Sequence, residues 1–217
     1  MLQEWNIGVV IPARNESKHI EHVLSTLPSF VDHAVVIDDG STDDTAEIAL
    51  STHCSAELSL VKLDGVGVGK AIDTGHQKLL EIFADSKFVS AVMAGDGQMD
   101  PEDLEGLVTC VISGKAEHIK GDRSSHPEGL RSMPLIRRLA TILLSFFTSL
   151  AAGQTISDSQ CGYTATSYAV LRNWNWNKSW SGYGYPNFWI IQLVKHGWKI
   201  SHQTVRAIYG DEVSGIN

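Results

Sequence analysis

Acidic side chains directly follow three separate stretches of apolar and β-branched residues. Asp38 and Asp39 come after HAVVI, Asp96 comes after FVSAVMAG, and Asp122 comes after AEHIKG. Each stretch has the length and composition of a buried strand. Open α/β sheets bind their ligands at the carboxyl ends of parallel strands. We therefore expect these carboxylates to gather at one rim of a sheet.

The segment MAGDGQMDPED places oxygen ligands in a turn. Asp96 ends a predicted strand, Gly97 gives backbone freedom, and Gln98 offers an amide oxygen. Asp100 is the expected N-cap of a helix that begins at Pro101. A tight turn with a cap would explain Gly97 and Asp100, but not Asp96 and Gln98 together. Oxygen donors suit Mg²⁺ or Mn²⁺, which complete their shell with phosphates and water, so the segment predicts such a site.

A glycine-rich segment, DGVGVGKA, precedes the third predicted helix. Its glycines match neither the Walker pattern nor GxGxxG, and Ala71 follows Lys70 where a hydroxyl residue would be needed. Two interpretations remain open. The segment is either a flexible turn into a helix, or a loop whose N–H groups, with Lys70, lie close to a diphosphate.

The first half of the chain alternates between strand and helix patterns. Strands separated by helices of this length imply right-handed crossovers. We therefore expect an α/β fold with a mainly parallel central sheet and helices on both faces, in one domain spanning 1–217. The strands are expected at 6–12, 33–38, 56–63, 88–96 and 116–122, and the helices at about 17–27, after a cap at Ser41 or Thr42, at 71–84, and from Pro101.

Composition excludes several classes of protein. With 43% hydrophobic and 19% charged residues the chain is globular, and its net charge of −8 argues against a nucleic-acid binder. Cys54, Cys110 and Cys161 have no CxxC spacing and indicate reduced thiols. The N-terminus lacks a basic region followed by a long apolar run. We expect a cytoplasmic protein.

Five motifs occur in the order seen in family 2 glycosyltransferases: VVIPARNE, VVIDDGSTDDT, AGDGQMDPEDL, KGDR and DSQCGYTA. The chain most closely resembles the dolichol-phosphate mannose synthase-like branch, whose acceptors are polyprenyl phosphates. The resemblance covers about Ile7 to Ile208. It implies a GT-A (Rossmann-like) fold, a GDP- or UDP-sugar donor and a divalent metal. The nucleotide-sugar half would be about 1–122 and the acceptor-side half about 123–217.

The resemblance also assigns roles to single residues. Asp39 matches the acid that contacts the nucleoside, and Asp96 matches the second acid of a metal-binding Asp-x-Asp, with Gln98 as a further ligand. Ala94 replaces the first of those acids, so the donor diphosphate would have to supply more of the metal shell. A binding module without turnover therefore stays an alternative. The residues expected around the nucleotide-sugar are Pro12, Ala13, Arg14, Glu16, Asp38, Asp39, Lys70 and Asp96.

The acceptor side follows from the later motifs. Arg123 matches a basic residue near the donor and acceptor phosphates, and Asp158 and Gln160 match the stretch that faces the acceptor. Asp96, Arg123 and Asp158 are the expected catalytic residues of an inverting displacement. A polyprenyl phosphate is already ionised and needs no base, so Asp158→Asn should then be tolerated. A sugar hydroxyl would need a base, for which Asp158 is the candidate. The basic cluster favours the phosphate; its further members are Arg131, Arg137 and Arg138.

Two segments leave a choice between core packing and a membrane surface. The apolar run 139–152 is shorter than the roughly 20 residues that span a bilayer. It is either a core helix or a helix lying at the membrane interface beside Arg137 and Arg138. The aromatic residues of 174–183 either pack on the domain edge or lie at the headgroup level. Peripheral contact with the cytoplasmic membrane face is therefore an alternative.

Overall fold

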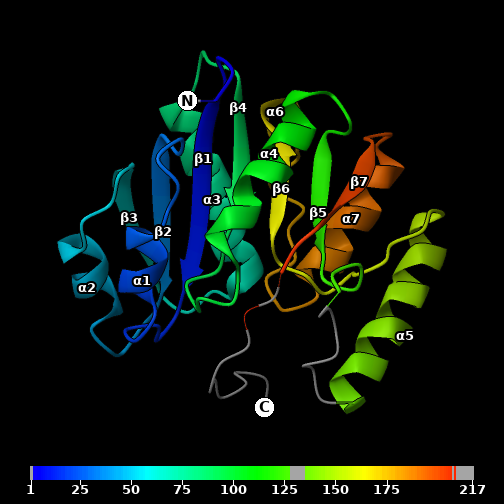
Figure 1. Cartoon of the computed structure of the whole chain (residues 1–217), viewed down its shortest axis with the longest axis horizontal. Coiled ribbons are helices and arrows are strands. Elements are labelled where there is room, and N and C mark those ends of the chain that lie inside the picture. Colours follow the sequence, from blue (N-terminus) through cyan, green and yellow to red (C-terminus); the bar gives the residue numbers. More distant parts are fainter. Residues whose placement is uncertain (1, 128–134, 207, 209–217) are drawn as a thin grey trace.

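The computed structural model describes residues 2–127, 135–206 and 208, with the side chains of 136 and 137 excepted. Their centre is a seven-stranded sheet in the order β3-β2-β1-β4-β6-β5-β7 (Figure 1). Every pairing that involves β6 is antiparallel, and the other pairings are parallel. The strands are β1 (Asn6–Ala13), β2 (His33–Asp39), β3 (Glu57–Leu63), β4 (Phe88–Val92), β5 (His118–Asp122), β6 (Thr164–Ser167) and β7 (Ile200–Thr204).

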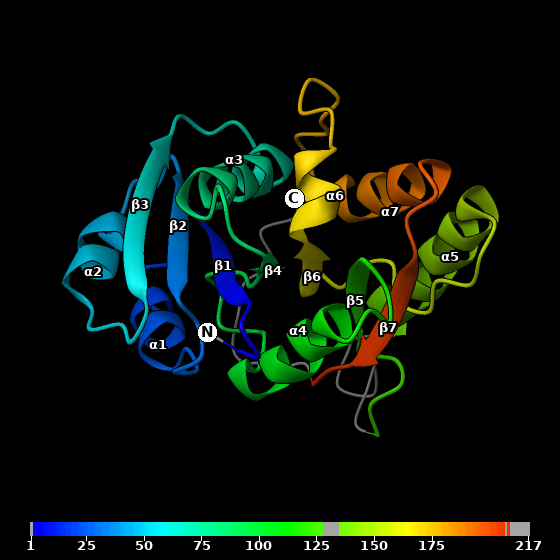
Figure 2. The same ribbon diagram turned by 90° about the horizontal axis from the view of Figure 1, so that it is seen from above.

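Helices cover both faces of this sheet, as Figure 2 shows from above. One apolar core lies between the sheet and α1, α2 and α4, and the other between the sheet and α3, α6 and α7. The predicted α/β fold is thereby confirmed. The helices are α1 (Ile20–Ser25), α2 (Thr45–Ser51), α3 (Val68–Ile82), the short 3₁₀ helix Pro101–Asp103, α4 (Leu104–Ile112), α5 (Leu135–Ala152), α6 (Tyr168–Arg172) and α7 (Tyr185–Lys195).

Of the two helix caps predicted from the sequence, one is present in the structure and the other is not. Asp100 is the N-cap before Pro101, and its Oδ1 accepts the Glu102 N–H at 3.0 Å, as expected. The expected cap at Ser41 or Thr42 is wrong, because α2 begins later, with Asp44 at the N-cap position. The Ser41 hydroxyl instead accepts the backbone N–H of Asn15 at 2.9 Å, which ties the loops after β1 and β2 together.

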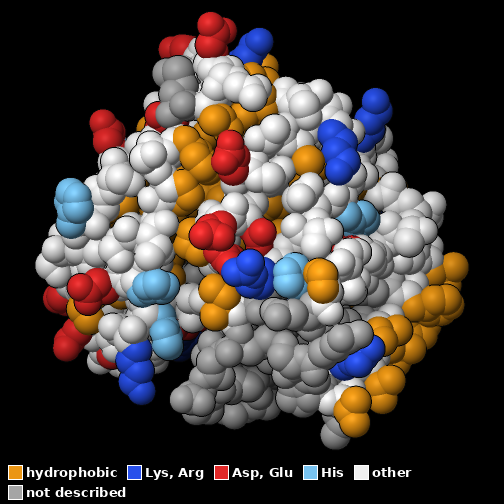
Figure 3. Space-filling view, viewed as in Figure 1, with side chains coloured by type: hydrophobic (Ala, Val, Ile, Leu, Met, Phe, Trp, Pro, Cys, Tyr) orange, Lys and Arg blue, Asp and Glu red, His pale blue; other side chains and the backbone are white. Residues whose placement is uncertain are grey.

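Helix α5 turns its polar face towards the protein and its apolar face towards the solvent, the opposite of most helices in globular proteins. Its hydroxyl residues Thr141, Ser145 and Thr148 are each only 5% exposed and face the molecule. Its large apolar side chains face outward, so the core-helix interpretation of the run 139–152 is wrong. Figure 3 shows this apolar edge at the lower right. These outward side chains, each between 42% and 74% exposed, are Leu135, Leu139, Ile142, Leu143, Leu144, Phe146, Phe147 and Leu150.

Hydrogen bonds explain why the hydroxyl face of α5 points inward. The Ser145 hydroxyl accepts the Ser159 N–H at 2.9 Å, and the Ser149 hydroxyl accepts the Ile156 N–H at 2.9 Å. The segment before β6 thus needs acceptors that only the polar face of α5 provides. Across the helices that the structure describes, none is long and apolar enough to cross a membrane.

Candidate active site

The loop after β1 lies between the loops after β2 and β4. Asn15, whose φ is +58°, accepts the Thr42 N–H at 2.8 Å, and Glu16 donates its N–H to the Thr45 hydroxyl at 2.8 Å. On the other side, the Gly95 N–H donates to the Pro12 carbonyl at 3.0 Å, and Ala13 is in close contact with Gly95. The motif predicted to hold the nucleotide is therefore built into the centre of the rim.

Asp39 organises the glycine-rich loop. Its Oδ1 accepts the Val66 N–H at 2.7 Å and its Oδ2 accepts the Gly67 N–H at 2.8 Å. Each carboxylate oxygen has a second lone pair, so these bonds leave acceptor capacity for a nucleoside. Asp38 closes its own turn by accepting the Ser41 N–H at 3.0 Å. The nucleoside contact of Asp39 stays a prediction.

The glycine-rich loop is joined to a segment that follows α6. The Gly69 N–H donates to the Ser181 carbonyl at 2.9 Å, and a side chain at Gly69 would overlap the Trp180 carbonyl. Asp73 on α3, almost fully buried, accepts the hydroxyls of Ser179 and Tyr185, the latter at 2.7 Å. Burial raises the pKa of Asp73, and the two hydroxyl donors oppose this. The sequence analysis did not predict a role for Asp73. The only sign in the sequence was an acidic residue on the apolar face of α3, which does not identify its partners.

The aromatic segment 174–183 is partly packed in the core and partly exposed, and its expected place at the headgroup level stays a prediction. Trp174 packs into the core on the α7 side, where Trp176 is packed against it. Trp180, whose carbonyl lies against Gly69, is 53% exposed, and Tyr183 is 66% exposed. Lys70 is half-buried near Asp73, whose negative charge it stabilises. Lys70 lies in the first turn of α3, and its contact with a diphosphate stays a prediction.

The turn after β4 has the donors that the sequence indicated. Asp96 Oδ1 accepts the Gln98 N–H at 3.0 Å across Gly97, whose φ is +73°. In the described part of the chain, no three His, Cys, Asp or Glu side chains converge as a metal site. One carboxylate and one amide oxygen, both half-buried, fit a hard divalent ion that takes its remaining ligands from phosphates and water.

This turn is tied to the acceptor-side motif. Tyr163, in DSQCGY, is fully buried and donates its hydroxyl to the Asp100 carbonyl at 3.1 Å. Arg206, just after β7, donates to Asp100 Oδ2 at 3.1 Å. The proposed metal turn is thus held from both β6 and β7. The sequence did not predict this contact, because an aromatic residue next to a strand indicates only that it is part of the core.

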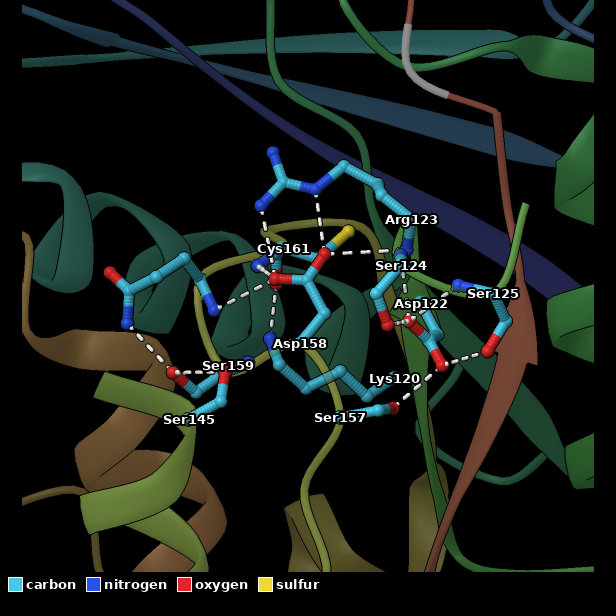
Figure 4. Close-up of polar contacts among 11 residues, drawn as sticks. Lys120, Asp122, Arg123, Ser124, Ser125, Ser145, Ser157, Asp158, Ser159 and Cys161 are labelled. Atoms are coloured by element: carbon cyan, nitrogen blue, oxygen red, sulfur yellow. Dashed lines mark hydrogen bonds and ion pairs between the residues drawn. The ribbon is translucent and has the colours of Figure 1, made fainter. Parts of the chain in front are cut away.

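Arg123 and Asp158 form a bidentate ion pair at the end of β5 (Figure 4). Arg123 Nε donates to Asp158 Oδ2 at 2.7 Å and Nη2 donates to Oδ1 at 3.0 Å. The backbone N–H groups of Gln160 and Cys161 donate to Asp158 Oδ1, both at 3.2 Å. Asp158 is fully buried, which by itself raises its pKa, but the bonds and charge of Arg123 outweigh burial and hold the pKa below its usual value.

Asp122 fixes the turn beneath this pair. Its carboxylate accepts the hydroxyls of Ser124, Ser125 and Ser157, the latter two at 2.6 Å (Figure 4). These donors lower the pKa of Asp122 despite its burial. Ser157 directly precedes Asp158, so Asp122 connects the turn that carries Arg123 to the turn that carries Asp158.

A cavity of about 530 Å³ opens between the loop after β5, the 156–157 segment and the inner face of α5. Arg138 and His126 line it together with serine and threonine hydroxyls, and Ile142 and Phe146 line its apolar part. Gln160 does not line it; its amide donates to Asn187 Oδ1 on α7 at 3.1 Å. Arg131 lies outside the described residues, as does the side chain of Arg137.

The two predicted clusters occupy different parts of one rim. From β2 to β5 there are four strand spacings, or roughly 19 Å at about 4.8 Å each. The nucleotide cluster at β1, β2 and β3 therefore lies well apart from Arg123 and Asp158. The Asp96 turn after β4 lies between them.

A model of glycosyl transferase family 2 matches residues 8–174. The chain belongs to this family. As a family 2 glycosyltransferase it has the GT-A fold, and the family predicted from its motifs is confirmed.

This glycosyltransferase is similar to several known proteins and solved structures. It is 30% identical over 181 residues to the UDP-N-acetylglucosamine–dolichyl-phosphate N-acetylglucosaminyltransferase of Methanococcus voltae, covering 76% of this chain and 71% of the relative. An uncharacterized protein of Methanocaldococcus jannaschii is 32% identical over 204 residues, covering 94% and 82%. Glucosyl-3-phosphoglycerate synthase from Mycobacterium tuberculosis, crystallised with Mn²⁺ and UDP-glucose, shares the fold at a TM-score of 0.66 and 22% identity, covering 96% and 72%.

Proposed function

We propose that this glycosyltransferase moves a sugar, with inversion, from a UDP-sugar to a polyprenyl phosphate at a membrane surface. The observation that carries the proposal is the cavity beneath α5. Its polar wall holds Arg138 and His126, and its apolar wall continues through Ile142 and Phe146 onto the exposed face of α5. A phosphate joined to a long apolar chain matches both walls. The named activity of the Methanococcus voltae relative supports both the UDP donor and the dolichyl phosphate acceptor.

The state of Asp158 supports a phosphate acceptor over a sugar hydroxyl. A hydroxyl acceptor needs a base that can take its proton. Asp158 is a poor base because Arg123 holds its pKa low and both its oxygens accept hydrogen bonds. A phosphate monoester is already largely ionised near neutral pH, because its second pKa is about 6. The residues present therefore suit an acceptor that needs cations and no base.

The outer face of α5 supports a lipid surface as the place of reaction. An exposed apolar patch of this extent exceeds what monomeric soluble proteins usually show. Helices with one apolar face bind at the boundary of headgroups and acyl chains, and basic residues favour anionic lipids. Arg138 is exposed near the N-terminal end of α5. The helix would lie flat with its hydroxyl face still bonded to the enzyme.

The donor side would be divided among the rim loops. Asp39 and the loop it holds would bind the nucleoside, and Lys70 would stabilise the diphosphate charge. Asp96 and Gln98 would hold a Mg²⁺ or Mn²⁺ ion, which when bound neutralises the leaving diphosphate. Arg123, fixed in direction by Asp158, would reduce the repulsion between donor and acceptor phosphates.

The acceptor test compares a short polyprenyl phosphate with the matching polyprenol, using UDP- and GDP-sugars and Mn²⁺. We expect transfer only to the phosphate. Arg138→Ala should raise the acceptor KM about ten- to a hundredfold, because a charge-assisted contact contributes about 1.5–3 kcal/mol. Lys62→Ala, which removes a 60% exposed lysine on β3, is the matched control. Better transfer to the alcohol would refute the phosphate acceptor. Donor binding without turnover on any acceptor would favour the binding-module alternative.

The membrane test measures co-sedimentation with vesicles that contain anionic phospholipid. We expect Leu139→Ser combined with Phe147→Ser to abolish binding, because both side chains are more than half exposed on α5. Leu50→Ser is the control, since Leu50 is 63% exposed on α2, at the other end of the sheet. Equal binding by both variants would show that α5 is not the membrane contact.

A further inference from the structure

Lys120 is a fully buried lysine in the middle of β5. A buried ammonium group is costly unless it is bonded and paired. Lys120 has such partners: its Nζ donates to the Cys161 carbonyl, and Asp158 lies close enough to stabilise its charge. We propose that Lys120 is a positioning residue for transfer, which holds Asp158 and thereby aims Arg123 at the reacting phosphates.

Lys120 links β5 to the turn that contains Asp158. Lys120 lies on the strand that leads directly into Asp122 and Arg123. Its bond to the Cys161 carbonyl joins this strand to the turn 158–161, and the Cys161 N–H in turn donates to Asp158 Oδ1 (Figure 4). Lys120 therefore adds a second side-chain link, beside the Asp122–Ser157 bond, between the two backbone segments that carry the Arg123–Asp158 pair.

Charge also links Lys120 to the ion pair. The Asp158 carboxylate lies between the side chains of Lys120 and Arg123, and the charges of both stabilise it (Figure 4). Because Asp158 interacts with both Lys120 and Arg123, its charge does not act on Arg123 alone, which leaves the guanidinium more attractive to phosphate oxygens than in an isolated pair. Without the Lys120 charge, Arg123 and Asp158 would form a neutral pair with less attraction for phosphate oxygens.

The surroundings of Lys120 are consistent with this role. Burial lowers the pKa of Lys120, Cys161 and Asp158 oppose that shift, and Arg123 adds to it. On β7, His202 is the register partner of Lys120, and burial is the main reason that its pKa is lowered. On β5, His118 is buried and also has a lowered pKa, partly because of Lys120. These two histidines therefore favour the neutral form and do not replace the lysine as a cation.

The inference rests on the proposed place of Arg123 beside the phosphates, and the experiment separates the two. Lys120→Met, Arg123→Ala, Asp158→Asn and the double variant Lys120→Met/Asp158→Asn are compared for kcat, donor KM and acceptor KM. His202→Gln is the matched control, because it changes the register partner of Lys120 on β7 and keeps the bond from Lys120 to the Cys161 carbonyl. We expect Lys120→Met to lower kcat about ten- to a hundredfold with KM values changed less than about threefold.

The double variant decides whether Lys120 acts through Asp158. We expect it to be no slower than Asp158→Asn alone, because residues that act as a unit are not additive. Multiplied effects, or a kcat of Lys120→Met equal to that of His202→Gln, would overturn the proposal. If Lys120→Met does not fold, Lys120→Gln decides in the same assays, since it removes the charge and keeps a donor. Normal transfer by Arg123→Ala would instead refute the proposed role of Arg123.

Discussion

The substitution Asp158→Asn tests the buried ion pair most directly. Asp158 is fully buried and the Arg123 side chain is only 12% exposed, so solvent screens the pair weakly. Asparagine keeps the volume but removes the charge, and its NH₂ group would face a guanidinium or a backbone N–H donor. Removing one partner of a buried pair costs about 3–5 kcal/mol, because the other charge is left uncompensated. For a chain of this size each kcal/mol lowers Tm by about 2–4 °C.

We therefore expect Asp158→Asn to lower Tm by roughly 6–20 °C, measured by circular dichroism at pH 7. The sequence alone suggested that this variant would be tolerated, because a phosphate acceptor needs no base. The structure leads to a different expectation, since Asp158 supports Arg123 whether or not it ever takes a proton. Transfer should fall steeply even at temperatures where the variant is folded.

A second variant separates stability from activity. Replacing a buried ion pair by apolar residues of similar volume is often neutral or stabilising. We expect Arg123→Met/Asp158→Leu to recover part of the Tm that Asp158→Asn loses, because the guanidinium is no longer left uncompensated, although Lys120 loses its acidic partner. Transfer should stay absent because Arg123, the cation proposed to lie between the donor and acceptor phosphates, has been removed. A Tm within about 2 °C of wild type for Asp158→Asn would refute the reasoning. So would measurable transfer by the double variant.

Three further predictions follow from individual side chains. Asp96→Asn should abolish transfer and leave Tm nearly unchanged, since its carboxylate is the one charged donor proposed for the metal; normal activity in the folded variant would end that assignment. Asp39→Ala should raise the donor KM more than it lowers kcat, because it loosens the Val66–Gly67 loop far from the reacting carbon; a fall in kcat alone would contradict this. Burial lowers the pKa of His76 to about 3, so between about pH 3 and pH 6.5 the unfolded chain binds more protons than the folded protein. The free energy of unfolding should therefore fall as the pH drops through this range. In urea titrations, His76→Gln should reduce the dependence of this free energy on pH by about 1.4 kcal/mol per pH unit.

The first half of the fold was predictable because its central strands β1 and β2 are rich in β-branched residues and buried on both faces. β1 and β2 are nearly continuous apolar runs, and the Asp100–Pro101 pair marks a helix start that depends only on local chemistry. β6 and β7 were not predicted. Their sequences, TATS and ISHQT, are largely polar and lack the apolar pattern by which a strand is recognised. They form strands because β6 pairs with β4 and β5, and β7 pairs with β5.

The site was predictable as a set of residues but not as a set of contacts. Motif order pointed to Arg123 and Asp158, yet their pairing joins positions 35 residues apart, on either side of α5. Lys120 and Asp73 could not be assigned roles, because a charged residue within an apolar pattern indicates neither its burial nor its partner. The outward apolar face of α5 was equally ambiguous, since helical periodicity does not say which face points inward.

The position of β6 has a consequence for the order in which the enzyme forms. β6 lies between β4 and β5, although it follows both in the chain. When β5 leaves the ribosome, neither of its two sheet neighbours, β6 and β7, has yet been made. The strands β1 to β4 can pair with one another as they emerge, whereas the segment that carries Arg123 must wait for residues 164–167 and 200–204. Nascent chains should therefore acquire the nucleotide side of the rim first, and the acceptor side only as synthesis passes β7.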